Sequence, residues 1–383
     1  MSGSARAPFT VQVGSGWYLA HPGGLERVFH ELTHRLSAAG IGVQGLVAGD
    51  ARVAAESGGV VRAFAPVDAP MWRRLLSCRR AARGLLDENP GALLVSHFAP
   101  YGLALLGLPA RRLIVHFQGP WSGESRAEGH GILSFAVRRA LEKRVYRRAD
   151  ACVVLSRAFR DLLHADFGVP LERIHVIPGG VATEQFASLP PRADARRRLG
   201  WRPDVPTVLA VRRLVRRTGL DRLIDAVPAL RARVPGVQVL IAGQGVEAEA
   251  LAARIRELGL GDAVRLLGRL SEEQLPLAYR AANLTVVPSI ALEGFGLIVP
   301  ESLAAGTPVL VTPVGGLPET VEDLSGAMIL RDATSGTIAE GLGEALLGER
   351  VLPGADACVA FARARYDWSV ITRRTAALYA SLA

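Results

Sequence analysis

Short apolar runs alternate with helical stretches along nearly the whole chain, and this alternation restricts the fold more than any other feature. Such runs are typical of strands that are buried on both faces of a parallel sheet. Strands separated by helices form βαβ units. The runs fall into two series: 11–13, 43–47, 93–96, 113–116, 151–155 and 175–177, followed by 207–211, 237–242, 263–267, 284–287 and 308–311. The sequence therefore predicts an α/β protein with two doubly wound, Rossmann-like domains.

The segment between the two series, 188–206, is rich in proline and arginine and lacks a long apolar face. We therefore place a linker at 191–205, between an N-terminal domain at 1–190 and a C-terminal domain at 206–365. A chain of 383 residues is long enough for two such cores. Doubly wound sheets bind ligands at the carboxyl ends of their strands, so we expect a central cleft where these edges face each other.

The basic composition does not indicate a nucleic-acid partner. The formal net charge is +9, Lys143 is the only lysine, and the arginines are spread over the whole chain. A nucleic-acid-binding protein usually concentrates its basic residues on one face. Two basic helical stretches, 72–83 and 138–148, are read as solvated helix faces, and contact with anionic lipid head groups is the open alternative.

Several further signals predict a cytoplasmic protein without a cofactor. Cys78, Cys152 and Cys358 are far apart and odd in number, which favours reduced thiols. The first residues lack the apolar core of a signal peptide, and no run of 18 apolar residues is free of charge. No Cys/His cluster has zinc spacing, and a D-x-D motif is absent, so no metal is predicted. Peripheral contact with the inner face of a membrane stays open.

The segment 285–316, TVVPSIALEGFGLIVPESLAAGTPVLVTPVGG, carries most of the functional information. The apolar run 284–287 reads as a strand, 294–296 as a Gly-Phe-Gly turn, and 297–305 as a helix that ends at Gly-Thr-Pro. A loop of this kind exposes backbone N–H groups at a helix N-terminus, where the aligned dipoles favour an anion.

Two carboxylates, Glu293 and Glu301, stand eight residues apart in this segment. No other ligand-like residues cluster with them, so they do not indicate a metal site. They suit hydrogen bonds from sugar or ribose hydroxyls, and the alternative is a pair of solvated helix charges.

With both glutamates, the strings GFGLIVPE and AAGTPV resemble the donor-binding motif of retaining GT-B glycosyltransferases, family 4. The glycines, the acids and the Gly-Thr-Pro stop all fall in register. The resemblance runs from about Val11 to the final helix. It implies a GT-B fold and retaining transfer of a hexose-type sugar from a UDP- or GDP-sugar to an acceptor hydroxyl. It also implies that the C-terminal helix, 366–383, returns to the N-terminal domain.

The resemblance implies a role for each part of the donor site. Glu293 holds sugar hydroxyls beside the reacting carbon, and Glu301 holds the ribose. Arg213, just after the strand 207–211, stabilises the diphosphate as charge develops. The other implied donor contacts are Gly23 and Gly24 of a GGxE loop, the turn residues Gly294, Phe295, Gly296 and Leu297, and, around the base, Gly243, Gly245 and Arg269.

The phosphate loop departs from the family pattern at one position. The pattern has an arginine and, five residues on, a lysine. Arg213 fills the first position, but the second is Thr218. Arg217 offers a charge in its place, one residue earlier. The loop 176–184 also departs, since Gly179 and Ala182 replace the usual Asn and Asp, and we assign no chemistry there.

On the acceptor side, His116 ends the strand 113–116, and the string that follows resembles the family's histidine–glycine loop. The resemblance implies that His116 orients the sugar or the acceptor, so that His116, Glu293 and Arg213 are the catalytic candidates. His97 and Trp121 are further acceptor-side candidates.

The acceptor and the activity keep alternatives at this stage. A small molecule, a lipid-linked sugar and a polysaccharide are all open as acceptors. A GT-B nucleotide-sugar epimerase or phosphorylase shares the scaffold, and outside enzymes the alternative is a non-catalytic, basic, membrane-surface binding protein.

Overall fold

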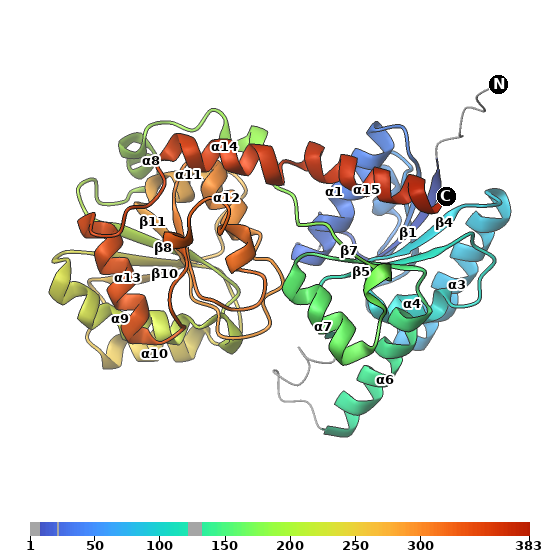
Figure 1. Ribbon diagram of the computed structural model, residues 1–383, viewed down its shortest axis with the longest axis horizontal. Helices are drawn as coiled ribbons and strands as arrows, with labels where there is room; N and C mark the ends of the chain where they lie inside the picture. Colours follow the sequence, from blue (N-terminus) through green and yellow to red (C-terminus); the bar gives the residue numbers. More distant parts are fainter. Residues whose placement is uncertain (1–7, 21–22, 122–131) are drawn as a thin grey trace. The chain divides into compact units, whose positions relative to one another are not determined.

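The computed structural model describes residues 8–20, 23–121 and 132–383. They form two compact units (Figure 1). Unit 1 comprises the chain up to Gly179 together with Trp368–Ala383, and unit 2 comprises Gly180–Asp367. Each unit contains one parallel sheet, so the predicted α/β class with two Rossmann-like sheets is confirmed. The domain limits inferred from the sequence stay a prediction.

Unit 1 is built on a seven-stranded sheet in the order β3-β2-β1-β4-β5-β6-β7, with every neighbouring pair parallel. In the register, Thr10 lies opposite Val43 of β2 and Leu93 of β4. The direction of strand order reverses between β1 and β4, which is where such sheets bind ligands. The strands are β1 (Phe9–Gly16), β2 (Gly42–Ala48), β3 (Val61–Ala65), β4 (Leu93–Ser96), β5 (Leu113–Phe117), β6 (Ala151–Val154) and β7 (Ile174–Val176).

The helices of unit 1 bury their apolar faces against this sheet. In α1, Val28, Leu32 and Leu36 are buried, as their helical spacing predicts. The final helix, α15, packs against α1, and the Arg35 guanidinium lies 6.0 Å from the ring centroid of Trp368. The helices are α1 (Gly24–Ala38), α2 (Arg52–Glu56), α3 (Met71–Glu88), α4 (Ala99–Leu105), α6 (Ile132–Arg148), α7 (Arg157–Phe167), η1 (Leu171–Arg173) and α15 (Trp368–Leu382).

Unit 2 contains a five-stranded parallel sheet in the order β10-β9-β8-β11-β12. Strand order reverses between β8 and β11 (Figure 1). The strands are β8 (Thr207–Val211), β9 (Gln238–Ala242), β10 (Val264–Gly268), β11 (Leu284–Val287) and β12 (Val309–Val311). The helices are η2 (Thr183–Phe186), α8 (Arg192–Leu199), η3 (Arg216–Thr218), α9 (Leu220–Arg233), α10 (Ala248–Glu257), α11 (Gln274–Ala281), α12 (Ile298–Ala304), η4 (Pro318–Thr320), η5 (Gly326–Met328), α13 (Ser335–Leu347) and α14 (Ala355–Tyr366).

Strand β3 and helix α8 are among the elements that the sequence did not predict. Strand β3 lies at the edge of its sheet, and of its residues only Val61 is buried. Helix α8 lies within the segment that reads as a linker. Its Arg196 is buried and donates to the Ala281 carbonyl at 2.9 Å and to Asn283 Oδ1 at 2.7 Å, so tertiary contacts hold this basic helix.

The helical stretch near the C-terminus is divided at Asp367. Helix α14 ends before this residue and belongs to unit 2, whereas α15 begins after it and belongs to unit 1. The chain therefore passes from one unit to the other twice, near residue 180 and again at residue 367.

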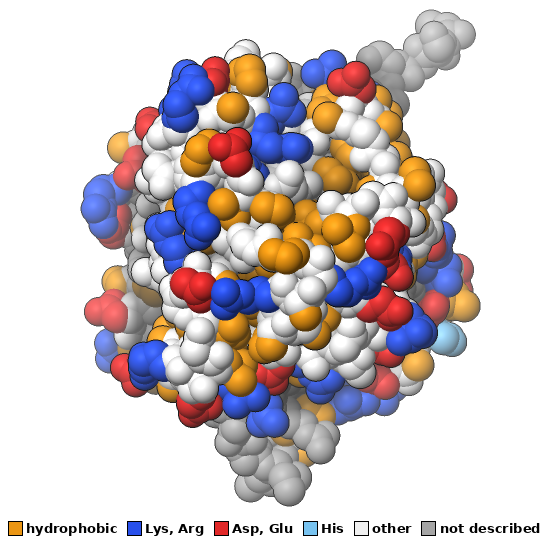
Figure 2. Space-filling model, turned by 90° about the vertical axis from the view of Figure 1, so that its left-hand side faces the viewer, with side chains coloured by type: hydrophobic (Ala, Val, Ile, Leu, Met, Phe, Trp, Pro, Cys, Tyr) orange, Lys and Arg blue, Asp and Glu red, His pale blue; other side chains and the backbone are white. Residues whose placement is uncertain are grey.

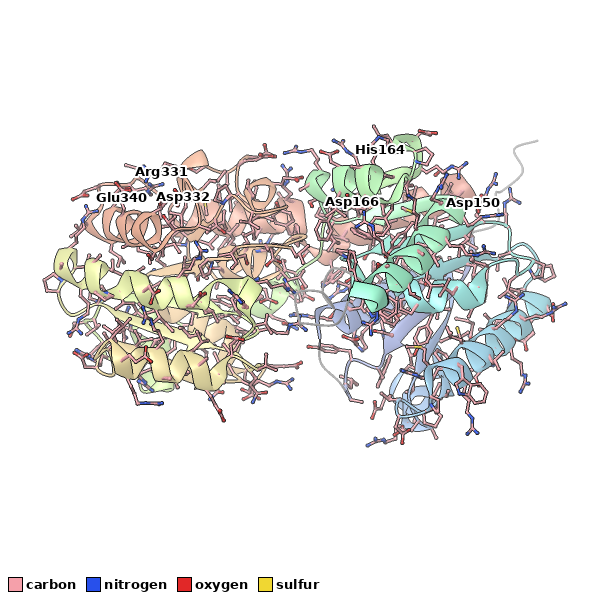
Figure 3. The ribbon with its side chains drawn as sticks, turned by 90° about the horizontal axis from the view of Figure 1, so that it is seen from below. Asp150, His164, Asp166, Arg331, Asp332 and Glu340 are labelled. Atoms are coloured by element: carbon pink, nitrogen blue, oxygen red, sulfur yellow. The ribbon has the colours of Figure 1, made fainter. Side chains whose placement is uncertain are left out.

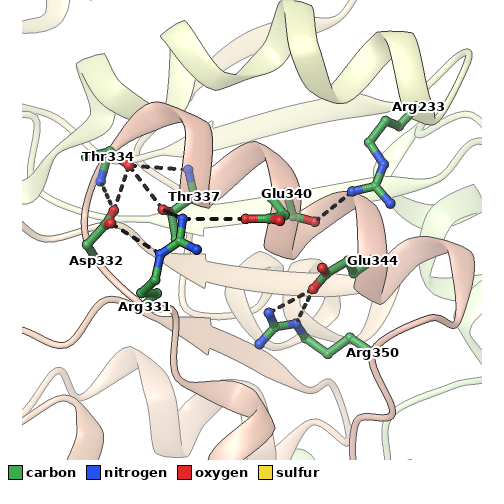
Figure 4. Close-up of polar contacts among 8 residues, drawn as sticks. All are labelled: Arg233, Arg331, Asp332, Thr334, Thr337, Glu340, Glu344 and Arg350. Carbon is green, nitrogen blue, oxygen red and sulfur yellow. Dashed lines mark hydrogen bonds and ion pairs between the residues drawn. The ribbon is translucent and has the colours of Figure 1, made fainter.

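Polar side chains organise the start of α13 (Figure 4). The Thr334 hydroxyl accepts a hydrogen bond from the Thr337 N–H at 3.3 Å, which caps the helix. Asp332 accepts from the Thr334 N–H at 2.8 Å and from its hydroxyl at 2.6 Å. The hydrogen bonds to Asp332 lower the pKa of its carboxyl to about 2.

Charges of opposite sign are mixed on the face of the molecule shown in Figure 2. Arginines pair with acids in both units, as in Arg231–Asp262, Arg254–Asp225 and Arg139–Asp166. In unit 1, Asp150 also accepts a hydrogen bond from the Leu113 N–H at 2.8 Å (Figure 3 shows Asp150 and Asp166). Several arginines are therefore committed to exposed ion pairs, which contribute little to stability individually.

Candidate functional site

The basic loop after β8, residues 212–218, places its arginines in different environments. Arg213 is exposed, whereas the side chain of Arg212 is only 9% exposed. The guanidinium of Arg217 donates to the Leu292 carbonyl at 3.1 Å. The Thr218 hydroxyl is buried and contacts the carbonyls of Arg213 at 3.0 Å and Val215 at 2.6 Å, so it is committed to the loop itself.

Glu293 lies in the loop after β11 and is buried, which excludes the reading of a solvated charge. Arg212 Nη2 and the Ser289 hydroxyl both donate to Glu293 Oε2, the latter at 3.0 Å. Burial raises the pKa of this carboxyl, but the charge and hydrogen bond of Arg212, the charge of Arg217 and the Ser289 hydrogen bond outweigh burial and leave the pKa below its usual value. The carboxylate is therefore ionised at neutral pH.

The backbone around Glu293 is closely packed. Leu292 has a φ of 50°, and it is the one non-glycine residue with positive φ in the described parts of the chain. Gly315 has a φ of 56°, and a Cβ added there would lie 2.0 Å from the Glu293 carbonyl oxygen. The Gly316 N–H donates to that same oxygen at 2.9 Å. The loops after β11 and β12 therefore fix each other.

Glu301 lies one helix further along, in α12, which begins one residue later and ends one residue earlier than the predicted 297–305. Its side chain is also buried, and Tyr279 donates its hydroxyl to Oε2 at 2.8 Å. Phe295, in the turn between the two glutamates, packs edge-on against Tyr366 with ring centroids 5.5 Å apart, as a core residue does.

The loops after β9 and β10 border the basic loop. The Gly243 N–H donates to the Gly268 carbonyl at 2.7 Å. Gly243 has a φ of 142°, and an added Cβ would lie 1.8 Å from the Arg212 carbonyl oxygen, so only glycine fits there. A Cβ on Gly245 would similarly meet the Leu214 carbonyl at 2.2 Å. Arg269, after β10, is exposed.

In unit 1 the glycines of the GGxE loop begin α1. Gly23 is the N-cap residue, with extended backbone, and Gly24 is the first helical residue. The glutamate of this loop, Glu26, accepts a hydrogen bond from the Ser15 hydroxyl at 2.5 Å. This contact joins the start of α1 to the end of β1.

His97 follows β4 and His116 is the last residue but one of β5, and the structure brings them together. Their rings stack with centroids 4.3 Å apart. His97 Nε2 shares a hydrogen bond with Gln12 Oε1 at 2.9 Å, and His116 Nε2 shares one with the Tyr379 hydroxyl of α15 at 2.9 Å. Burial lowers the pKa of His116 to about 3, and burial with the neighbouring His116 lowers the pKa of His97 as well. Both rings are therefore neutral at neutral pH.

Trp121 begins the segment 121–131, of which residues 122–131 lie outside the described residues. Its backbone N–H donates to Glu142 Oε1 at 2.8 Å, and the Arg138 guanidinium lies 4.6 Å from the centroid of the Trp121 ring. Glu142 is itself buried and also accepts from the Tyr146 hydroxyl at 3.2 Å.

The sequence reasoning missed three side chains that contact the predicted acids: Arg212, Ser289 and Tyr279. Arg212 could have been predicted from the sequence, because it directly precedes Arg213 after the end of β8. Ser289 and Tyr279 have no sequence signal of their own. No group of His, Cys, Asp and Glu in the described parts of the chain could hold a metal ion, and no helix there is long and apolar enough to cross a bilayer.

Solved structures share this architecture over nearly the whole chain. Alr3699/HepE of Anabaena, in complex with UDP, has a TM-score of 0.78 at 20% identity, covering 98% of this chain and 100% of that chain. Sucrose-phosphate synthase of Thermosynechococcus elongatus has a TM-score of 0.79 at 24% identity, covering 98% and 99%. The two parallel Rossmann-like sheets are therefore those of the GT-B class.

Sequence comparison identifies the family within that class. Residues 22–185 match the family described as Glycosyltransferase Family 4, and residues 191–365 match Glycosyl transferases group 1. The chain belongs to this glycosyltransferase family, as the motifs of 285–316 predict.

Named relatives are similar to this chain over part of their own length. A GDP-mannose-dependent alpha-(1-6)-phosphatidylinositol monomannoside mannosyltransferase of Mycobacterium tuberculosis is 31% identical over 266 residues, 67% of this chain and 66% of the relative. A D-inositol 3-phosphate glycosyltransferase of Nocardia farcinica is 36% identical over 216 residues, 55% of this chain and 47% of the relative. The chain thus spans about two thirds or less of the length of these curated relatives.

Proposed function

We propose that this chain is a retaining, metal-independent hexosyltransferase that moves a sugar from a UDP- or GDP-sugar to an acceptor hydroxyl. The observation that carries the proposal is the buried, ionised Glu293 beside Arg212 and Arg217, at the carboxyl ends of β8 and β11 where strand order reverses. The similarity to named glycosyltransferases, one of them GDP-mannose-dependent, supports a nucleotide-sugar donor.

The proposed chemistry breaks one bond and forms another at the anomeric carbon. The bond from this carbon to the diphosphate oxygen breaks, and Arg213 with nearby backbone amides stabilises the leaving group as charge develops. The acceptor oxygen forms its bond on the same face, and its proton goes to the departing phosphate oxygen. The products are a glycoside with retained configuration and a nucleoside diphosphate.

The other site residues bind and orient in this proposal. Glu293 accepts hydrogen bonds from sugar hydroxyls and Glu301 from the ribose. A neutral His116, fixed by Tyr379, orients the sugar or the acceptor rather than carrying a proton. The glycines after β9 let the backbone come close to the base, with Arg269 at the rim.

We propose that the acceptor binds unit 1 in a cavity of about 760 Å³ at the carboxyl ends of its first strands. Carboxylates of Asp50, Glu56 and Asp68 line it, together with apolar groups of Leu19 and Val67. Asp50 is paired with Arg52 of the same lining, and Glu56 accepts a hydrogen bond from the Trp17 indole. Carboxylates accept hydrogen bonds from hydroxyls, which suits an acceptor rich in hydroxyl groups. Asp68→Asn should therefore raise the acceptor KM and leave the donor KM unchanged.

Helix α3 supports a second proposal, that the chain contacts an anionic membrane surface. Trp72 and Leu76 are 59% and 60% exposed, and the exposed Arg73, Arg80 and Arg83 flank them on the same helix. Apolar side chains beside arginines suit the head-group region of a bilayer. The double variant Trp72→Glu/Leu76→Glu should lose co-sedimentation with phosphatidylglycerol vesicles, whereas Val351→Glu, at an 83% exposed position in unit 2, should not. Failure of the wild type to co-sediment would refute the proposal.

The activity is tested first with donors alone. UDP, GDP and their common sugar derivatives are screened by thermal shift, because a ligand that binds only the native state raises the melting temperature. Slow hydrolysis is then measured, and acceptors are screened with the donor that binds. We expect one base to stabilise the protein. An unchanged melting temperature with both nucleoside diphosphates would contradict the assignment.

Analysis of the reaction products distinguishes a glycosyltransferase from an epimerase and from a phosphorylase. An epimerase would convert the donor sugar without an acceptor, and a phosphorylase would require phosphate. Glu293→Gln is the matched control, since it should slow transfer while the protein stays folded.

A further inference from the structure

Among the described residues, hydrogen bonds reach only one oxygen of the Glu293 carboxylate, Oε2. Arg212 Nη2 and the Ser289 hydroxyl both donate to Oε2, and Arg212 Nη2 also donates to Ser289 Oγ at 2.8 Å. The other oxygen, Oε1, faces the glycine turn, where a Cβ built on Gly296 would lie 3.9 Å away. Among the described residues, no hydrogen bond reaches Oε1, so this oxygen remains available to a ligand.

The arginine that holds Oε2 is not explained by folding alone. The Arg212 side chain is only 9% exposed, and its Nε–H is buried without a hydrogen-bond partner in the described residues. A buried polar group that lacks a partner destabilises the fold. The family resemblance assigns no role to this position, whereas it does assign one to the exposed Arg213.

A second arginine faces the same carboxylate. Arg217 donates to the carbonyl of Leu292, the residue before Glu293, and its charge acts on Glu293. Arg212, Arg217 and Ser289 are thus the charged and polar side chains that face Glu293 from the basic loop and from the end of β11.

We infer that Arg212 is a positioning residue for the proposed transfer: with Ser289 it fixes Oε2 of Glu293, so that an ionised Oε1 is presented to a hydroxyl of the donor sugar. This inference rests on the proposed function, since it requires a donor sugar at Glu293.

The experiment compares Arg212→Gln, Arg212→Lys and the control Arg216→Gln, which changes an exposed arginine of the same loop. For each variant, kcat and the donor kcat/KM are measured across pH. Arg212→Gln removes the opposite charge while burial of Glu293 persists. We therefore expect the acid limb of kcat/KM to move up by about one pH unit or more.

The same variant should also lower kcat by about tenfold or more, because a displaced site group slows the reaction. Arg212→Lys keeps the charge and should retain the wild-type acid limb, although its single ammonium cannot reproduce the planar donor geometry. Arg216→Gln should match the wild type in every respect.

Two results would overturn the inference. One is an Arg212→Gln enzyme with wild-type kcat/KM and pH profile. The other is an equal loss of activity at every pH with the acid limb unmoved, because a residue that only supports the fold or contacts phosphate would behave in that way.

A double-mutant cycle separates this inference from the proposed function. The free energy of unfolding is measured in urea for Arg212→Gln, Glu293→Gln and the double variant, and we expect the two changes to be non-additive. An active wild type with additive changes overturns the inference and leaves the proposed function intact. A wild type that binds and turns over no nucleotide sugar refutes the proposed function, and with it the donor role of Arg212, even where the cycle shows coupling.

Discussion

At the scale of single residues, the surroundings of the two glutamates differ although both are buried. Glu293 contacts a guanidinium and a serine hydroxyl, whereas Tyr279 donates to Glu301. A buried carboxylate beside an arginine stays ionised and can respond to charge that develops nearby. Glu301 lies in α12, the helix that follows the turn, and is suited to a contact that stays constant during the reaction. The two acids should therefore affect different kinetic parameters.

The first prediction separates the two acids. Glu301→Gln should raise the donor KM with little change in kcat, because ribose contacts are equal in the ground and transition states. Glu293→Gln should lower kcat, because it acts beside the reacting sugar. Steady-state kinetics with a confirmed donor measure both effects, and Glu249→Gln on the exposed face of α10 is the control. Wild-type kinetics in both site variants would leave the acids with a structural role only.

The second prediction concerns the missing lysine. Arg217→Ala should raise the donor KM and slow turnover by about one to two orders of magnitude, since a charge-assisted hydrogen bond contributes about 1.5–3 kcal/mol. Thr218→Lys should partly restore activity in that background. Arg213→Ala should be at least as damaging. If Arg217→Ala keeps wild-type kinetics while Arg213→Ala is strongly impaired, one arginine suffices. If both variants keep wild-type kinetics, the diphosphate does not bind at this loop.

At the scale of elements, a histidine stack joins β4, β5 and α15 inside unit 1. His97 and His116 contact each other, and Gln12 and Tyr379 hold their outer nitrogens. Neither imidazole can take up a proton without placing a charge in a buried site, and a second proton would repel the first. The sequence placed both residues at strand ends, but the contact with α15 joins residues 263 positions apart and has no local signal.

The third prediction follows from the lowered histidine pKa values. Both lie below the unfolded value of 6.5, so the unfolded chain binds more protons as the pH falls below 6.5. The stability contribution of the neutral stack is therefore fully present above pH 6.5 and is lost progressively toward the folded pKa of His116, about 3. Urea unfolding between pH 7 and about pH 4 should show this loss.

The loss should be smaller in His97→Gln, because one of the two buried groups no longer titrates. His164→Gln, which changes an exposed histidine of α7 (labelled in Figure 3), should keep the wild-type slope. Equal slopes in all three proteins would refute this account.

At the scale of the whole molecule, the chain builds two units, each with a reversal of strand order and predicted site residues near the carboxyl ends of its strands. Unit 2 holds the acids and the basic loop, and unit 1 holds the histidine stack and the GGxE glycines. In the proposed reaction arginines stabilise the leaving diphosphate, so the chemistry requires no bound cation.

The fourth prediction tests this point. Transfer should persist in excess EDTA, because guanidinium groups and backbone amides provide the positive charge that a divalent ion would otherwise provide. Initial rates are compared with and without chelator, and then after addition of Mg²⁺ or Mn²⁺. Complete loss on chelation with recovery on adding metal would refute the leaving-group chemistry, though not the family assignment.

The sequence by itself determined the fold class, the family and the positions of Glu293, His97 and His116 at or after strand ends, because apolar periodicity and local turn chemistry depend on neighbouring residues. It did not reveal β3, an edge strand with one buried residue, or α8, whose buried Arg196 makes tertiary contacts. Only the tertiary structure decided that Arg212 rather than its neighbour turns inward to Glu293, and that Tyr279 and Tyr379 reach Glu301 and His116. Such contacts join residues far apart in the chain, and packing selects them, whereas sequence patterns record only local preference.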